Sequence, residues 1–256
     1  MQLYVINLER SKDRLEHITA VFQERNLVFI RVLGVDGSIL RRKDFRFLTS
    51  KRNWPLKLTY AEVACFLSHR ECLRLIGEGP DAYGAIFEDD IILSPNAPVF
   101  LKQSSWIPFD TDMIKLDTAG ISCLIGRVIA KLEGGYSLAP LMSKHYCAAG
   151  YIVSKRCAQW LYKNIEYAIA PIDEIYFNPD CDIMHRLNIY QMIPAPVMQA
   201  GLASTIRTSK KEIRLSSNLS MYQKIRKECK RFKKRYCFHM KKRFLFQERR
   251  VKIAFQ

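Results

Sequence analysis

The feature that most constrains the fold is a regular alternation of strand-like and helix-like segments in the first hundred residues. Short runs rich in apolar and β-branched residues are followed by longer runs with apolar residues at helical spacing. In order they are strand-like 3–8, helix-like 13–25, strand-like 27–34, a helix-like segment after Thr59, and strand-like 83–90. This order is typical of an α/β fold, in which helices flank a mostly parallel sheet.

Two of the expected helices carry clear start signals. Thr59 and Glu62 match a capping box, in which the hydroxyl and the carboxylate each accept a backbone N–H at the helix start. Further strands are expected at 113–117 and 147–154, and Ser154 stands where it can cap the next helix. The alternation is therefore expected to continue well past residue 100.

Polar residues follow three of the predicted strands. Asn7 ends the first strand, Asp36 follows the second, and the cluster Glu88-Asp89-Asp90 ends the strand at 83–90. In open sheets of this kind, ligands bind in the crevice beyond the carboxyl ends of the strands. These side chains are therefore expected to line a binding crevice.

The acidic cluster lies in the otherwise apolar run AIFEDDIIL. Side chains alternate along an extended segment, so Glu88 and Asp90 are expected to face one way and Asp89 the other. Two carboxylates on one side suit a hard divalent cation such as Mg²⁺ or Mn²⁺, which can neutralise a diphosphate. The alternative is a solvated strand end or a helix cap.

Several other classes of site lack support in the sequence. Neither G-x-G-x-x-G nor G-x-x-x-x-G-K-[ST] is present, and G-x-S-x-G is absent as well. The eight cysteines contain no C-x-x-C pair, and the N-terminus does not resemble a signal peptide. We therefore expect a protein of the reducing cytosol, without disulfides and without a zinc site. No apolar run reaches the about 18 to 20 residues of a membrane-spanning helix.

Positive charge is concentrated at the C-terminal end. The segment from Thr205 to Gln256 holds 18 Lys and Arg against 3 Glu, whereas the formal charge of the whole chain is +16. The chain thus divides into a nearly neutral domain, 1–206, and a basic segment, 207–256, for which we expect a helix. Basic and aromatic residues alternate in this segment, a pattern that favours binding to an anionic membrane surface. A helix docked on the body with a solvated basic face is the alternative, and nucleic-acid binding is a weaker one.

Several blocks, in order along residues 1 to 206, resemble glycosyltransferase family 25, the bacterial lipopolysaccharide and lipooligosaccharide hexosyltransferases. The blocks are YVINLERSKDR (4–14), VDG (35–37), LTYAEVACFLSH (58–69), FEDDIILSP (87–95), YCAAGYIVSKRCAQWL (146–161), PID (171–173) and IPAPVMQAGLASTI (193–206). Each block alone is weak evidence, but the ordered set is specific.

The resemblance implies a GT-A type, Rossmann-like fold, a UDP-hexose donor, a divalent metal (Mn²⁺ or Mg²⁺) and inversion at the sugar carbon. It places Glu88 and Asp90 as metal ligands in a D-x-D-like motif, although this chain has Glu first. The implied reaction transfers galactose or glucose to a sugar hydroxyl of the lipooligosaccharide or lipopolysaccharide core. The implied location is the cytoplasmic face of the inner membrane, where the basic segment would bind the surface.

Inversion by direct displacement requires a base for the acceptor hydroxyl. Asp173 is the first choice because the family has an acid in the PID block, and Asp182 and Asp117 are rivals. A helix cap after Pro171 is the structural alternative for Asp173. His185 is a weaker candidate for a late metal ligand.

The candidate donor-binding residues come from the strand ends and from the resembling blocks. An arginine there can pair with a diphosphate, Asn7 can bond uracil or ribose, and Asp36 can hold ribose hydroxyls or form a turn. For His69 a core role is the alternative. The full set is Asn7, Arg10, Arg14, Asp36, Ser68, His69, Asp89 and Gln199, with Ser204 as an addition and Trp54, Tyr60, Tyr146 and Tyr151 as aromatic candidates for sugar stacking.

Two further functions compete with the transferase. One is a cationic membrane- or nucleic-acid-binding protein that acts through the basic segment. The other is a metal-dependent hydrolase that cleaves nucleotide sugars with the same acids.

Overall fold

The computed structural model describes residues 1–52, 54–201 and 248–256. The strands are β1 (Gln2–Asn7), β2 (Ile30–Leu33), β3 (Tyr83–Glu88), β4 (Ile91–Leu93), β5 (Met113–Lys115), β6 (Asp117–Thr118), β7 (Ser122–Ile125), β8 (Ala130–Lys131), β9 (Ser137–Pro140), β10 (Gly150–Ser154), β11 (Ile189–Ile193), β12 (Val197–Gln199) and β13 (Arg249–Lys252). The α-helices are α1 (Lys12–Gln23), α2 (Arg42–Leu48), α3 (Tyr60–Glu78), α4 (Ala97–Leu101), α5 (Lys155–Asn164) and α6 (Ile172–Phe177), with 3₁₀ turns at Glu133–Gly135 and Met184–Arg186.

The central sheet has 8 strands in the order β2-β1-β3-β10-β5-β11-β9-β8. Strands β2, β1 and β3 are parallel neighbours, and β5 pairs in parallel with β11. Strands β10 and β9 are antiparallel to their neighbours. The remaining six strands of the sheet all point in the same direction. The expected α/β class with a mostly parallel sheet is confirmed.

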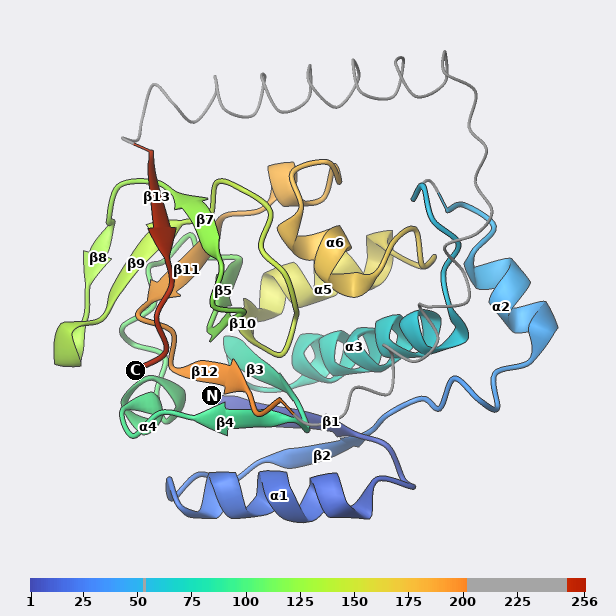
Figure 1. The fold of residues 1–256 in the computed structure, drawn as a ribbon, viewed down its shortest axis with the longest axis horizontal. Coiled ribbons are helices and arrows are strands. Elements are labelled where there is room, and N and C mark those ends of the chain that lie inside the picture. The colour runs from blue at the N-terminus through green and yellow to red at the C-terminus, as the bar shows by residue number, and fades with distance from the viewer. Residues whose placement is uncertain (53, 202–247) are drawn as a thin grey trace.

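Alternate residues of β1 pack into two cores on opposite faces of the sheet. Leu3 and Val5 join the core that contains Ile18 and Phe22 of α1, whereas Tyr4 joins the core beneath α3, α5 and α6. Figure 1 shows α1 on one side of β1 and β2 and the α3, α5 and α6 group on the other. This period of two is the pattern of a strand buried on both faces.

The predicted helix starts are confirmed. Thr59 and Glu62 form the complete capping box of α3, and Ser154 Oγ accepts the Cys157 amide at the start of α5. The predicted strand 27–34 is shorter in the structure, because β2 begins at Ile30. Residues 27–29 lie before the strand: Leu27 is buried in the core, whereas Val28 is 87% exposed.

The acidic cluster differs from the expectation. Strand β3 ends at Glu88, and Asp89 and Asp90 form a turn before β4. The predicted alternation, with Glu88 and Asp90 on one face, is therefore wrong, because the extended backbone it requires stops at Glu88.

The C-terminal end also differs from the expected helix. Strand β13 pairs with β7, and Ile253 is only 1% exposed within the core. The last residues of the predicted segment 207–256 thus form a strand on the body. The rest of that segment, and Ser204, lie outside the described residues. In the part of the chain that the structure describes, no helix has the length and apolar character to cross a bilayer.

Candidate active site

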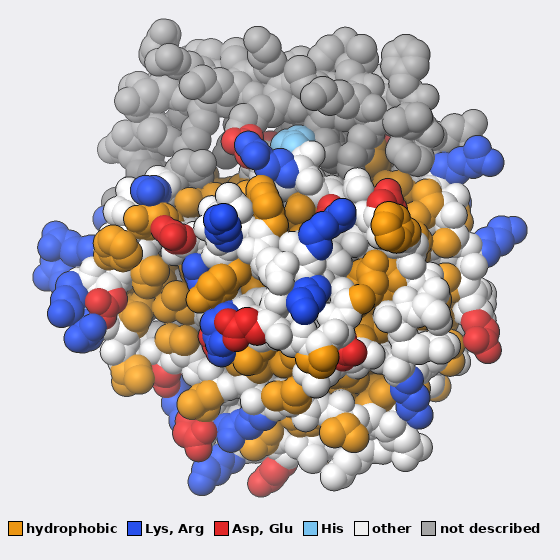
Figure 2. Space-filling view, turned by 180° about the vertical axis from the view of Figure 1, so that it is seen from behind, with side chains coloured by type: hydrophobic (Ala, Val, Ile, Leu, Met, Phe, Trp, Pro, Cys, Tyr) orange, Lys and Arg blue, Asp and Glu red, His pale blue; other side chains and the backbone are white. Residues whose placement is uncertain are grey.

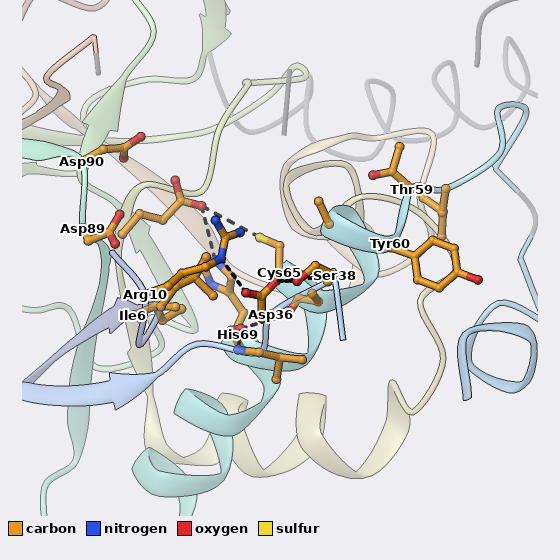
Figure 3. A pocket seen from close by; sticks show the side chains of 18 of the residues that line it. Ile6, Arg10, Asp36, Ser38, Thr59, Tyr60, Cys65, His69, Asp89 and Asp90 are labelled. Atoms are coloured by element: carbon orange, nitrogen blue, oxygen red, sulfur yellow. Dashed lines mark hydrogen bonds and ion pairs between the residues drawn. The ribbon is translucent and has the colours of Figure 1, made fainter. Parts of the chain in front are cut away.

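A cavity of about 570 Å³ lies beyond the carboxyl ends of β1, β2 and β3. This is the volume range of small-molecule sites. Of the predicted residues, those that line it are Arg10, Arg14, Asp36, Tyr60, Ser68, His69, Glu88, Asp89, Asp90 and Gln199. Figure 3 shows Asp89 and Asp90 at one side of the cavity and Thr59 and Tyr60, at the start of α3, at the other. The expected crevice at the strand ends is confirmed.

Asp89 is held by two side chains from the first part of the chain. Asn7 Nδ2 donates to Asp89 Oδ2 at 2.7 Å, and Arg14 Nη1 donates to Asp89 Oδ1 at 2.7 Å. Asn7 is buried and does not line the cavity. Its amide nitrogen binds the acidic turn through Asp89, and its amide oxygen, Oδ1, accepts a hydrogen bond from Arg31 Nε. Asp89 thus fixes the turn and is the acid with protein partners on both oxygens.

Asp90 is more weakly compensated. The Arg14 Nη2 atom is 3.7 Å from its Oδ2, and its buried Oδ1 has no hydrogen-bond partner among the described residues. Burial, followed by the charge of Glu88, raises the pKa of Asp90 to about 6. A buried carboxylate oxygen without a partner is what a cation ligand requires before the ion binds.

Glu88 faces α3. Its Oε1 lies 3.6 Å from His69 Nε2 and 4.0 Å from Cys65 Sγ, and its Oε2 accepts from Gln199 Nε2 at 3.4 Å. His69 is fully buried, and its Nδ1 is 2.9 Å from the Tyr151 hydroxyl. Although burial acts to raise the pKa of Glu88, the neighbouring His69 imidazole, 3.6 Å away, lowers it overall.

The Val35-Asp36-Gly37 loop forms the rim near α3. Arg10 Nε donates to Asp36 Oδ2 at 2.5 Å, and this bond, with help from Ser38, lowers the pKa of Asp36 to about 2. Asp36 Oδ1 also accepts the Ser38 amide, so the Asx-turn alternative is present as well. Ser68 Oγ accepts the Val35 amide at 2.9 Å and therefore supports this loop from α3.

The three candidate bases lie in different places. Asp173, in the first turn of α6, accepts the Cys147 amide at 3.3 Å and the Glu174 amide at 3.0 Å. Asp117 is fully buried against Lys115, with Nζ to Oδ1 at 2.6 Å. Asp182 is exposed and lines a separate hollow with Trp160 and Arg186 that has no residue in common with the large cavity.

Asp173 is linked to the acidic cluster through Cys147. The Cys147 thiol is 3.5 Å from Gln199 Oε1, and Gln199 in turn binds Glu88. Cys147 has a left-handed backbone (φ 67°), and Lys115 Nζ donates to its carbonyl at 2.6 Å. A non-glycine residue in this region is strained, so Lys115 holds the turn that carries the amide bound by Asp173.

The weaker predictions have mixed outcomes. His185 Nε2 lies 2.6 Å from the Pro179 carbonyl, away from the cavity. Tyr60 lines the cavity and stacks on Phe45 at 4.2 Å between ring centroids. Tyr151 is wrong as a sugar platform, because it is fully buried beneath His69.

Sequence reasoning missed three residues near the site. The sequence assigns Cys65 no role, yet its thiol faces Glu88. Lys115 and Cys147 gave no motif signal. A lysine within the apolar run MIKLD, two residues before an aspartate, was the one available sign of a buried ion pair.

Comparison of the sequence with known proteins identifies a family and several relatives. Residues 1–176 match the family glycosyltransferase family 25 (LPS biosynthesis protein). The lacto-N-neotetraose biosynthesis glycosyltransferase LgtB of Neisseria meningitidis serogroup A is 29% identical over 215 residues, 76% of this chain and 73% of the relative. The lipooligosaccharide biosynthesis protein lic2B of Haemophilus influenzae is 29% identical over 229 residues, 84% of this chain and 80% of the relative.

A solved structure of Drosophila β-1,4-galactosyltransferase 7, in complex with manganese, UDP-Gal and xylobiose, gives a TM-score of 0.36 at 9% identity. The match covers 87% of this chain and 77% of the galactosyltransferase chain. A TM-score this low supports no statement about the site.

The chain belongs to glycosyltransferase family 25 (LPS biosynthesis protein), and it is therefore a glycosyltransferase.

Proposed function

We propose that this protein is an inverting, GT-A type hexosyltransferase that moves galactose or glucose from a UDP-sugar to a sugar hydroxyl of the lipooligosaccharide or lipopolysaccharide core. The observation that carries the proposal is the acidic turn at the mouth of the cavity. One acid, Asp89, is bound by Arg14, and another, Asp90, has no partner on Oδ1 among the residues that the structure describes. The cavity contains an arginine, a carboxylate that can bind a cation, and the polar ends of several strands. This combination suits a nucleoside diphosphate.

The donor would lie across the strand ends. Arg10 and Arg14 supply positive charge for the diphosphate, and the Asp36 carboxylate supplies acceptors for ribose hydroxyls at the rim. Glu88 and Asp90 would hold Mn²⁺ or Mg²⁺. The Asp90 Oδ1 atom, which has no partner in the described part of the chain, and the half-buried Glu88 carboxylate fit a hard cation. When bound, the ion neutralises charge on the diphosphate as it leaves.

Asp173 is the proposed base. It lies in the first turn of a helix and is half-buried; it does not line the cavity, but three successive hydrogen bonds through Cys147 and Gln199 join it to Glu88. In this role its carboxylate takes the proton of the acceptor hydroxyl as that oxygen attacks the sugar carbon from the face opposite the diphosphate. Inversion follows from the single displacement.

We also propose that the enzyme works on an anionic membrane surface at the cytoplasmic face of the inner membrane. Support comes from the surface around α2, where Ile39 and Phe47 are 78% and 63% exposed. The cations Arg42, Lys43 and Arg46 are exposed beside them. Figure 2 shows a group of Lys and Arg side chains at its left edge, where α2 lies in this view from behind. Phe45 of α2 lines the cavity, so this surface adjoins the site.

The membrane proposal is tested by vesicle flotation. The full chain should float with vesicles of anionic phospholipid, and a variant with Arg42, Lys43 and Arg46 changed to Gln should float less. Equal flotation of the two proteins would contradict a role for α2. Flotation of both with neutral vesicles would show that charge does not drive binding.

The function is tested with UDP-galactose and UDP-glucose, with Mn²⁺ or Mg²⁺, in the presence and absence of truncated lipooligosaccharide. We expect acceptor-dependent UDP release that needs the metal and falls at least about 100-fold in Glu88→Gln plus Asp90→Asn. The matched control is Asp13→Asn plus Glu16→Gln, which removes two exposed carboxylates of α1.

Other outcomes separate the alternatives. UDP release that truncated lipooligosaccharide does not stimulate would support the nucleotide-sugar hydrolase. Unchanged turnover in the double variant would contradict the metal role. A product of retained anomeric configuration would contradict inversion. No turnover of either donor would favour a cationic binding protein.

A further inference from the structure

Three side chains of different chemistry converge on one wall of the cavity. Cys65 and His69 are four residues apart on α3, so they lie on the same face one turn apart. Glu88, at the end of β3, faces both: its Oε1 is 4.0 Å from Cys65 Sγ and 3.6 Å from His69 Nε2. The three potential ligand atoms all lie within 4.8 Å of one another.

The two separations that involve Glu88 are close to those of a tetrahedral zinc site, whereas the Cys65 and His69 ligand atoms are known only to lie within 4.8 Å of each other. Zinc binds sulfur at about 2.3 Å and nitrogen or oxygen at about 2.0 to 2.2 Å, so neighbouring ligand atoms are about 3.3 to 3.6 Å apart. The separation of 3.6 Å between His69 and Glu88 is at this value, and that of 4.0 Å between Cys65 and Glu88 exceeds it by only a few tenths of an ångström. Side-chain rotation of Cys65 and Glu88 could provide this contraction.

An independent observation points to a ligand at this position. His69 is fully buried, and its Nε2 has no hydrogen-bond partner among the residues that the structure describes. The other ring nitrogen lies 2.9 Å from the Tyr151 hydroxyl, which fixes the ring with Nε2 toward Glu88. When Nδ1 donates its proton to Tyr151, Nε2 presents a lone pair, and this is the usual arrangement of a metal-binding histidine.

We propose that Cys65, His69 and Glu88 bind Zn²⁺, with the fourth position open to the cavity. A thiolate, an imidazole and a carboxylate form a softer ligand set than the oxygen atoms that suit Mn²⁺ or Mg²⁺. On binding, the Cys65 thiol gives its proton to solvent. The cysteine pattern predicted no zinc site, because one ligand comes from a distant strand and not from a C-x-x-C pair.

The site has a consequence that rests on the proposed function. Glu88 cannot serve Zn²⁺ and the ion of the donor in the same geometry. Micromolar Zn²⁺ should therefore inhibit the Mn²⁺-dependent transfer, and excess Mn²⁺ should relieve the inhibition. Zinc binding itself requires neither donor nor acceptor, so it can be measured whether or not the protein is a transferase.

The test uses the full chain with Cys229 and Cys237 changed to Ser, which removes two cysteines beyond residue 201. Zinc is titrated by calorimetry, and Co²⁺ is used as a spectroscopic substitute. We expect one Zn²⁺ per chain, a near-ultraviolet thiolate-to-cobalt charge-transfer band, and the visible bands of tetrahedral cobalt. Cys65→Ser should abolish the charge-transfer band and weaken Zn²⁺ binding at least about 100-fold.

Two further variants make the result decisive. Cys147→Ser is the matched control, since Cys147 is also half-buried and lies near Glu88 through Gln199, and it should keep the band. Glu88→Gln should weaken Zn²⁺ binding without abolishing the thiolate band, which covers the case in which Cys65→Ser does not fold. Absence of stoichiometric Zn²⁺ binding, or a band that survives Cys65→Ser, would overturn the proposal.

Discussion

Arg14 Nη1 donates to Asp89 Oδ1 across 2.7 Å and so joins α1 to the turn after β3. Both side chains are largely buried, with 14% and 8% exposure. Asp89 therefore has its counter-charge within the protein, and its other oxygen accepts from Asn7. The three neighbouring acids thus differ in their contacts: Asp89 is part of the framework, and in the proposed function Glu88 and Asp90 are the ligands of the metal ion.

This pair should be strongly coupled in stability. Arg14→Met and Asp89→Asn should each lower the free energy of unfolding by about 2 to 3 kcal/mol, because each leaves a largely buried partner uncompensated. The double variant should lose less than the sum, with a coupling of about 1 to 2 kcal/mol. Urea unfolding of the four proteins measures the cycle, and additive losses would show that the contact contributes nothing of its own.

The buried Lys115–Asp117 pair should show a different pattern. Lys115→Met leaves Asp117 without its cation in the core and should destabilise the protein by about 3 to 5 kcal/mol. Lys115→Met plus Asp117→Leu removes both charges and should recover most of that loss. If the double variant is as unstable as the single one, the bond from Lys115 to the Cys147 carbonyl is the main contribution.

Cys147 should be unreactive despite its half-buried position. Burial, followed by the charge of Asp117, raises the pKa of its thiol to about 12. Because the thiolate is the nucleophile, alkylation at pH 8 should be about a thousandfold slower than for an ordinary cysteine and should accelerate about tenfold with each pH unit up to about 12. Peptide mass spectrometry after iodoacetamide treatment measures this, and the urea-unfolded chain gives the reference rate. Fast alkylation of the folded protein at pH 8 would contradict it.

The caps of two helices allow a matched comparison. Ser154 Oγ accepts the Cys157 amide, whereas Ser11 occupies the cap position of α1 without a side-chain cap bond. Ser154→Ala should therefore cost about 1 kcal/mol, and Ser11→Ala clearly less. Thermal or urea unfolding distinguishes them. Equal losses would mean that burial of the serine, rather than its cap bond, determines the effect.

Substitution of the two candidate bases, Asp173 and Asp182, should affect the transferase activity to different degrees. Asp173→Asn should reduce kcat by about 100-fold or more with little change in the KM for the donor, because it removes the proton acceptor and keeps the shape. Asp182→Asn is the matched control, and it should have no effect since Asp182 lines a different hollow. A large loss from the control variant, or none from the first, would reverse the assignment.

Much of the framework could be predicted because it depends on local signals. The capping box at Thr59 and Glu62, the Ser154 cap and the period of two along β1 are properties of a few neighbouring residues. The meeting of Asn7, Asp36 and the acidic cluster also follows, because the carboxyl ends of neighbouring parallel strands lie at one edge of the sheet.

The remainder could not be predicted because it depends on contacts that are distant in sequence. The split of the acidic cluster is decided by Arg14, 75 residues away, and by the end of β3 at Glu88. The position of Cys65 opposite Glu88 needs the packing of α3 on the sheet. The antiparallel direction of β10 has no signal in its own residues, since a buried strand reads the same in either direction.

Strand β13 determines how the basic segment can be studied. Its pairing with β7, the buried Ile253 and the bridge between Ala195 and Phe255 anchor the far end of the chain to the body. Deleting everything after residue 206 would remove a strand and part of the core together with the positive charge. An internal deletion or charge-neutralising substitutions that retain residues 248–256 would separate folding defects from the loss of charge, and a tag fused after Gln256 would be placed beside Tyr136, whose hydroxyl binds the Gln256 carbonyl.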